Sequence, residues 1–156
     1  MAPTSYTVAR STEISASAET VYALVADFHR WPAWSPWEQS DPNLERTYGG
    51  PDSGEGATYE WHGNRKAGAG TMTITEAERP GRVAIDLRFE KPFSAESTVV
   101  FTIVETGSTT TVDWTMAGNS TGFAKLFTKV VPMDKLIGKD FERGLRSLKE
   151  QAESGS

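Results

Sequence analysis

The sequence contains no cysteine, only two histidines and no long apolar run. Without cysteine the chain has no disulfides, no thiolate nucleophile and no zinc site that needs sulfur. His29 and His62 lie on different predicted elements with no third ligand spaced to join them, so we expect no metal site and no cofactor. No stretch approaches the roughly 20 apolar residues of a membrane-spanning helix, so we expect no stable membrane insertion.

Positive charge is also scarce, because 16 basic side chains face 21 acidic ones and the formal net charge is -5. The longest basic cluster is Arg65-Lys66, which is too little to offset repulsion from a phosphate backbone, so nucleic acid is not an expected partner. The N-terminus lacks the basic start and apolar run of a signal peptide. These features predict a cytoplasmic protein.

The chain has 156 residues, a length typical of one compact domain. We find no internal repeat, linker or low-complexity block, so residues 1–156 are predicted to form a single domain. The tail at residues 153–156 is expected to fray.

Alternating polar and apolar residues predict seven β-strands. Short β-branched and aromatic runs are separated by Gly, Pro, Asn and Asp at intervals typical of an antiparallel meander. The predicted strands are residues 6–14, 44–48, 58–61, 70–78, 82–89, 97–105 and 109–117.

Two short helices are predicted after the first strand. Ser15 or Ser17 can cap the first, which is expected to stop near His29. Pro32 suits the first turn of the second, and Pro36 is expected to end it. The apolar stripe of the first helix consists of Val21, Leu24, Val25 and Phe28.

Helical periodicity returns near the C-terminus, in a ladder of apolar residues at mostly four-residue steps. Pro132 predicts a break near Val131, followed by a main helix from residue 133 to about 151, roughly 28 Å long. The ladder consists of Leu126, Val130, Met133, Ile137, Phe141, Leu145 and Leu148. The chain is therefore predicted to be an α+β protein with a curved seven-stranded antiparallel sheet around a long C-terminal helix.

Several segments resemble the START-like (SRPBCC) superfamily, in particular its bacterial polyketide cyclase/dehydrase-type branch. The similar segments are Phe-His-Arg-Trp-Pro-Ala-Trp-Ser-Pro-Trp at 28–37, Tyr-Glu-Trp-His-Gly-Asn at 59–64, Lys-Pro-Phe at 91–93, Val-Asp-Trp-Thr-Met at 112–116 and the helical run at 133–149. The resemblance implies a helix-grip fold with a hydrophobic cavity between the sheet and the C-terminal helix. It leaves activity open, because members include carriers, sensors and some enzymes.

Large apolar side chains gather where such a cavity would lie. Three of the five tryptophans fall at positions 31, 34 and 37, and strand parity turns further rings toward the helix. For any single ring, ordinary core is the more common role. Our candidate ligand contacts are Trp34, Trp37, Tyr59, Trp61, Met72, Leu87, Phe89, Phe101, Trp114, Met133, Ile137, Asp140, Phe141 and Gly144.

Two positions on the C-terminal helix allow two interpretations. Asp140 lies at the margin of the apolar stripe, where it is either a polar anchor in the cavity or an ion-pair partner of Arg143. Gly144 lies within the stripe, where it either enlarges the pocket or allows close packing.

The sequence shows no catalytic constellation. A relay of His62, Asp113 and a serine can be drawn, but no Gly-x-Ser-x-Gly pattern occurs. Parity sends Glu60, His62, Asp86, Arg88, Glu96, Thr102 and Asp113 to the outer surface of the sheet. Glu60, His62 and Asp140 are the candidate catalytic groups if the protein is an enzyme.

Three functions therefore remain open. The first is a binding protein for an apolar or amphipathic small molecule such as a lipid, a polyketide or an aromatic metabolite. The second is a cyclase or dehydratase that positions a flexible substrate and moves protons. The third is a co-chaperone-like interaction module using the outer face of the sheet, although no exposed apolar stripe supports it.

Overall fold

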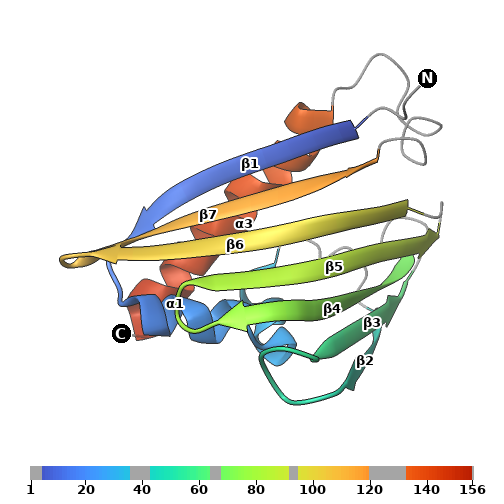
Figure 1. Ribbon diagram of the computed structural model, residues 1–156, viewed down its shortest axis with the longest axis horizontal. Helices are drawn as coiled ribbons and strands as arrows, with labels where there is room; N and C mark the ends of the chain where they lie inside the picture. The colour runs from blue at the N-terminus through green and yellow to red at the C-terminus, as the bar shows by residue number, and fades with distance from the viewer. Residues whose placement is uncertain (1–4, 36–42, 64–67, 92–94, 120–132, 156) are drawn as a thin grey trace.

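A single antiparallel sheet forms most of the structure, a computed structural model that describes residues 5–35, 43–63, 68–91, 95–119 and 133–155. Its order is β1-β7-β6-β5-β4-β3-β2, so neighbours in sequence are neighbours in the sheet except where β1 joins β7 (Figure 1). The strands are β1 (Ser5–Ile14), β2 (Glu45–Gly49), β3 (Thr58–His62), β4 (Ala69–Glu78), β5 (Arg82–Lys91), β6 (Ala95–Thr106) and β7 (Thr109–Asn119).

All seven predicted strands are confirmed, and each boundary lies within two residues of its prediction. The turns explain this accuracy, because they contain glycines that adopt positive φ. Gly107, between β6 and β7, has φ 64°. A register shift between Ile74 and Glu76 marks a β-bulge in β4, which bends the sheet.

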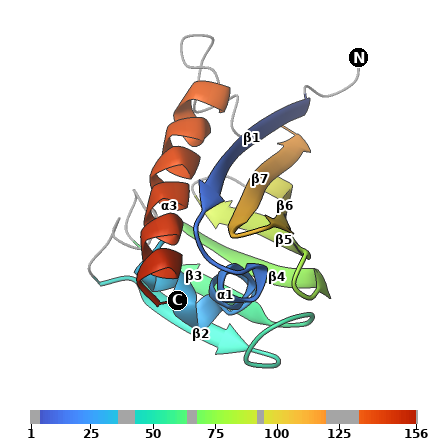
Figure 2. The same ribbon diagram turned by 90° about the vertical axis from the view of Figure 1, so that its left-hand side faces the viewer.

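The long helix α3 (Met133–Gly155) lies across one face of the sheet, as Figures 1 and 2 show from two directions. It begins directly after Pro132, as predicted. The predicted break near Val131 lies outside the described residues. The arrangement of sheet and helix confirms the helix-grip architecture.

The short helices differ in detail from their predictions. Ser17 caps α1 (Ala18–Val25), its side chain accepting a hydrogen bond from the Thr20 amide. This helix ends at Val25, before the predicted limit near His29. Asp27 then caps η1 (Phe28–Ala33), a 3-10 helix, by accepting from the His29 amide.

Two predictions on these helices are therefore wrong. Phe28 starts the second helix instead of ending the first, because the Asp27 cap interrupts the apolar stripe. Pro32 lies inside η1 and not in its first turn. The irregular 3-10 pattern tolerates this position, since η1 is too short to form a continuous ladder of hydrogen bonds. Pro36 lies outside the described residues.

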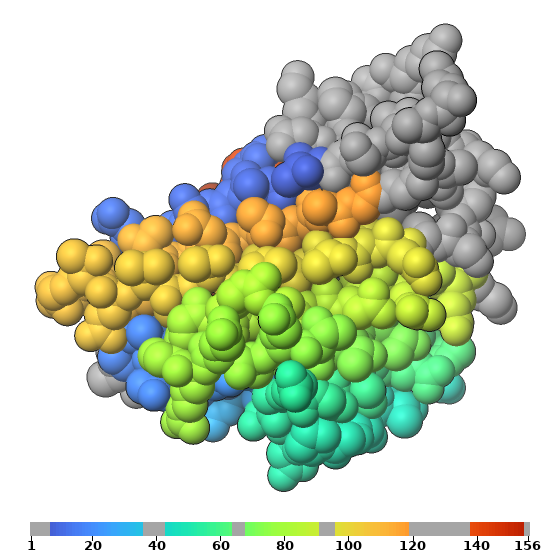
Figure 3. All heavy atoms as spheres, viewed as in Figure 1, coloured from blue at the N-terminus to red at the C-terminus, as the bar shows by residue number. Residues whose placement is uncertain are grey.

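Strand parity sorts the two faces of the sheet as predicted. Buried apolar side chains from all the long strands face α3 and form one core with α1 and η1. The opposite face, seen in Figure 3, carries partly or fully exposed polar side chains. Val104 is the one large hydrophobic side chain exposed in the described residues, at 51%. The outer face therefore offers no apolar stripe among these residues.

The C-terminal end of α3 is tied to the end of β1. Glu153 accepts hydrogen bonds from the Ser15 amide at 2.9 Å and from Lys149 Nζ at 2.7 Å, while Lys149 also donates to the Glu13 carbonyl. The helix therefore continues to Gly155, four residues past its predicted end near Gln151. Glu153, which the sequence placed in a fraying tail, is helical.

This tether predicts a pH-dependent stability. The hydrogen bond from Lys149, with that from the Ser15 amide, holds the pKa of Glu153 below its usual range. A depressed folded-state pKa contributes stability above the unfolded pKa, near 4.3 for glutamate, that is lost as pH falls through the folded value. We expect Glu153→Gln to melt below the wild type at pH 7 and the difference to close in acid. Thermal melts from pH 7 to pH 2 check this, and a difference independent of pH would contradict it.

Candidate functional site

Four aromatic side chains pack together between the sheet and the part of α3 around Phe141. Trp114 stacks on Phe141 with centroids 4.0 Å apart and planes at 8°, and Phe101 stacks on Trp114 at 4.9 Å. Trp34 meets Trp114 edge-on at 5.5 Å. All four residues are at most 2% exposed. We call Trp34, Phe101, Trp114 and Phe141 the aromatic core.

Trp31 of η1 and Trp34, the C-cap residue of η1, are each held by a hydrogen bond to the backbone. Trp31 Nε1 donates to the Val25 carbonyl at 2.9 Å, and Trp34 Nε1 donates to the Leu24 carbonyl at 3.0 Å. These carbonyls lie at the C-terminal end of α1, where helical carbonyls lack helical partners. Both indoles are therefore held in place by these bonds and are buried with the neighbouring rings.

A second apolar region lies on the same face, further along the sheet. Met72 lies opposite Leu87, and Gly70 lies between Trp61 and Phe89 in the strand register. Trp61 and Leu87 are 9% and 8% exposed, whereas Met72 and Phe89 are only partly buried. We call Trp61, Met72, Leu87 and Phe89 the apolar floor.

Gly70 leaves room for the ring of Trp61 within the apolar floor. A Cβ at this position would come within 2.6 Å of the Trp61 ring and 2.3 Å of the Arg88 carbonyl. The indole therefore occupies the space of the missing side chain and meets Phe89 edge-on, with centroids 5.7 Å apart and planes at 87°.

The remaining predicted ligand contacts are placed as follows. Tyr59 is buried, in ring contact with Phe28 and Trp61, and Gly144 is buried on α3. Trp37 lies outside the described residues, as do the side chains of Met133 and Ile137. Whether any of these residues contacts a ligand stays a prediction.

Of the two interpretations of Asp140, the structure contains the ion pair. Arg143 Nη2 donates to Asp140 Oδ1, and the Asp140 side chain is 27% exposed. Asp140 is therefore held at the helix surface by its neighbour one turn along.

The other two candidate catalytic groups lie on the outer face of the sheet. The side chains of Glu60 and His62 are 45% and 55% exposed, with His62 Nε2 3.7 Å from Glu60 Oε2. They project from β3 on the side opposite their buried neighbours Tyr59 and Trp61. Figure 2 shows α3 on one face of the sheet, so Glu60 and His62 lie on the face opposite the helix that carries Asp140. The three groups cannot act together on one ligand.

One ion pair links β1 to α3. Arg10 Nε donates to Glu142 Oε2 at 2.9 Å, and its guanidinium lies against Gly138, where a Cβ would be 2.2 Å from Nη2. Arg10 Nη1 also donates to the Ala9 carbonyl. The glycine thus lets an arginine on an inward-facing strand position reach across the helix.

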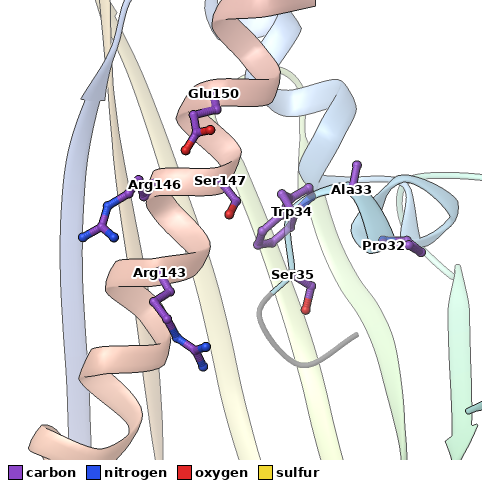
Figure 4. A pocket seen from close by; sticks show the side chains of 8 residues that line it. All are labelled: Pro32, Ala33, Trp34, Ser35, Arg143, Arg146, Ser147 and Glu150. Carbon is purple, nitrogen blue, oxygen red and sulfur yellow. The ribbon is translucent and has the colours of Figure 1, made fainter. Parts of the chain in front are cut away.

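A groove of about 320 Å³ lies between the end of η1 and one face of α3 (Figure 4). One wall contains Pro32, Ala33, Trp34 and Ser35, and the other contains Arg143, Arg146, Ser147 and Glu150. Apart from Trp34, none of these residues was predicted to form a site. The spacing of Arg143, Ser147 and Glu150 places them on one face of a helix and could have been recognised in the sequence. Nothing in the sequence indicates that Ser35 is buried.

Within the ranges given above, no group of three or more His, Asp or Glu side chains could hold a metal ion. The same residues contain no helix long and apolar enough to cross a membrane.

Solved structures share this fold at low identity. A START superfamily protein from Mycobacterium smegmatis is 19% identical with a TM-score of 0.63, covering 96% of this chain and 99% of that one. The Aha1 dimer from Colwellia psychrerythraea is 18% identical with a TM-score of 0.66, covering 97% and 98%. Norcoclaurine synthase from Thalictrum flavum, in complex with dopamine and hydroxybenzaldehyde, is 9% identical with a TM-score of 0.67, covering 99% and 90%.

Family comparison goes further than these structures, whose low identities establish the fold alone. No curated protein matches the chain. A family model described as polyketide cyclase / dehydrase and lipid transport matches residues 5–153, which is nearly the whole sequence. The chain therefore belongs to the polyketide cyclase / dehydrase and lipid transport family.

Proposed function

We propose that the protein binds an apolar or amphipathic small molecule against the apolar floor, on the face of the sheet covered by α3. The observation that carries this proposal is the contrast between the two halves of that face. In one half the aromatic core residues are at most 2% exposed, whereas Met72 and Phe89 in the other half are only partly buried. Apolar side chains facing inward yet incompletely covered by protein are typical of a ligand site.

The shape and chemistry of the floor suggest the class of ligand. Two rings meet edge to face, and Trp61 and Phe89 can offer both an indole face and a ring edge to an aromatic or polyene body. The family description includes both polyketides and lipids, and the related norcoclaurine synthase structure holds two small aromatic molecules. These relatives support a ligand with an extended apolar or aromatic part.

The described residues favour binding over catalysis. A cyclase or dehydratase needs acid and base groups within hydrogen-bond reach of its substrate. Glu60 and His62 lie on the outer face, and Asp140 is paired with Arg143. The co-chaperone alternative has no apolar outer surface among the described residues to support it.

A titration of paired variants tests the floor. Phe89→Ala removes a large part of the floor, so an apolar fluorescent dye should bind about tenfold more weakly, equivalent to about 1.4 kcal/mol. Arg88→Ala is the matched control, because it is the preceding residue on β5 and its side chain is exposed on the outer face with Asp86 and Glu96. Its dye affinity should stay within about twofold of the wild type.

Circular dichroism establishes that both variants are folded before the titration. Equal dye affinity in Phe89→Ala and the wild type would remove the floor as the ligand site. Equal weakening in both variants would show that the dye binds nonspecifically.

A further inference from the structure

The groove between the end of η1 and α3 has one cationic end and one acidic end. Arg143 and Glu150 lie two turns apart on α3, about 10 Å along its axis, with Ser147 between them. Figure 4 shows Arg143 near the Ser35 end of the groove and Glu150 at the opposite end. Asp140 already binds one side of Arg143, but a guanidinium has five N–H donors and one such contact leaves others available.

Ser35 contributes a side-chain hydroxyl to this groove. The residue is only 6% exposed, and its side chain lines the groove. Its backbone amide donates to the Trp31 carbonyl, but its hydroxyl makes no hydrogen bond with any residue in the described ranges. The hydroxyl can therefore donate one hydrogen bond and accept others from a molecule in the groove.

Trp34 gives the groove wall a fixed side chain beside Ser35. Trp34, next to Ser35, is fixed by its hydrogen bond to Leu24 and by the aromatic core. The volume of about 320 Å³ lies at the lower end of small-molecule sites and exceeds what a bare inorganic ion fills. A guanidinium facing hydroxyl donors is a recurrent arrangement for binding carboxylate and phosphate oxygens.

We propose that this groove is a second binding site, in which Arg143, Ser35 and Ser147 hold the oxyanion of a small organic carboxylate or phosphate ester. The site is separate from the apolar floor and does not depend on the function proposed for it. Arg146 adds positive charge to the wall, and Glu150 confines the anion to the Arg143 end by repulsion.

Benzoate is a suitable probe, since it combines a carboxylate with a body that fits the volume. Titration of the ¹⁵N-labelled protein at constant ionic strength should shift the amide resonances of Trp34, Ser35 and Ser147 saturably. Inorganic phosphate, added in excess, should displace benzoate because both present oxyanions to the same donors. Failure of phosphate to displace it would show that only the ring is recognised and would overturn the assignment.

Three variants separate a binding role from a structural one. Arg143→Gln should weaken benzoate binding at least about fivefold, since it removes the positively charged guanidinium that can donate two hydrogen bonds to a carboxylate. Ser35→Ala should weaken it about threefold without lowering the melting temperature, because it removes a hydroxyl that has no described partner. Arg30→Gln is the charge-matched control on the exposed side of η1 and should bind as the wild type does.

Two results would overturn the proposal. The first is a linear, non-saturating shift in the wild type. The second is an equal loss of affinity in Arg30→Gln and Arg143→Gln, which would reduce the effect to the overall charge of the protein.

Discussion

Replacing Phe141 by alanine should lower the free energy of unfolding by about 3–5 kcal/mol, the range for a buried ring in a close-packed core. Phe141 is 0% exposed, and its ring is nearly parallel to that of Trp114 at 4.0 Å. Its removal takes away one layer of the aromatic core and leaves a hole that rigid neighbours cannot fill. Urea denaturation followed by circular dichroism measures the loss.

Val104→Ala is the control for this experiment, since it also truncates an apolar side chain but at a position that is 51% exposed. It should change stability by less than about 0.5 kcal/mol. A loss below about 1 kcal/mol in Phe141→Ala would mean that the neighbouring rings relax into the space left by Phe141, contrary to a rigid, close-packed aromatic core.

Gly144→Leu is expected to cost about 1–3 kcal/mol through overpacking while leaving dye affinity unchanged. Gly144 is buried on α3, and its neighbours Phe141 and Leu148 on the same helix are fully buried. Close packing at this position would offset the usual cost of glycine in a helix, about 1 kcal/mol relative to alanine.

The opposite result for Gly144→Leu has an equally clear meaning. An unchanged or higher melting temperature, together with dye affinity at least about tenfold weaker, would mean that the leucine fills empty apolar space. Gly144 would then line a ligand cavity, and the aromatic core would extend less far along α3 than we infer.

The strands could be predicted closely because their signals are local. Alternation along β5, from Val83 to Phe89, determines which side chains face α3, and positive-φ glycines determine where turns fall. The boundary between α1 and η1 could not be predicted in this way. Phe28 continues the helical stripe in sequence, and only the cap formed by Asp27 reveals the break.

The residues on the inner face could be predicted from the sequence, but the division of that face into the aromatic core and the apolar floor could not. Parity placed both Trp114 and Phe89 on the inner face, yet only tertiary packing decides that one is stacked beneath a helix and the other partly open. Trp34 reaches the core through a bond to the end of α1, a contact between separate helices. Burial of Ser35 likewise depends on how η1 and α3 meet.

Native mass spectrometry of the protein, followed by extraction and identification of what dissociates, tests the binding proposal most directly. The protein should be purified from cells and also incubated with fatty acids and aromatic polyketides at tens of micromolar. Our account predicts one apolar or amphipathic molecule per chain, lost or weakened in Phe89→Ala and retained in Arg88→Ala. Spectra showing only the mass of the bare chain, both from cells and after incubation, would contradict it.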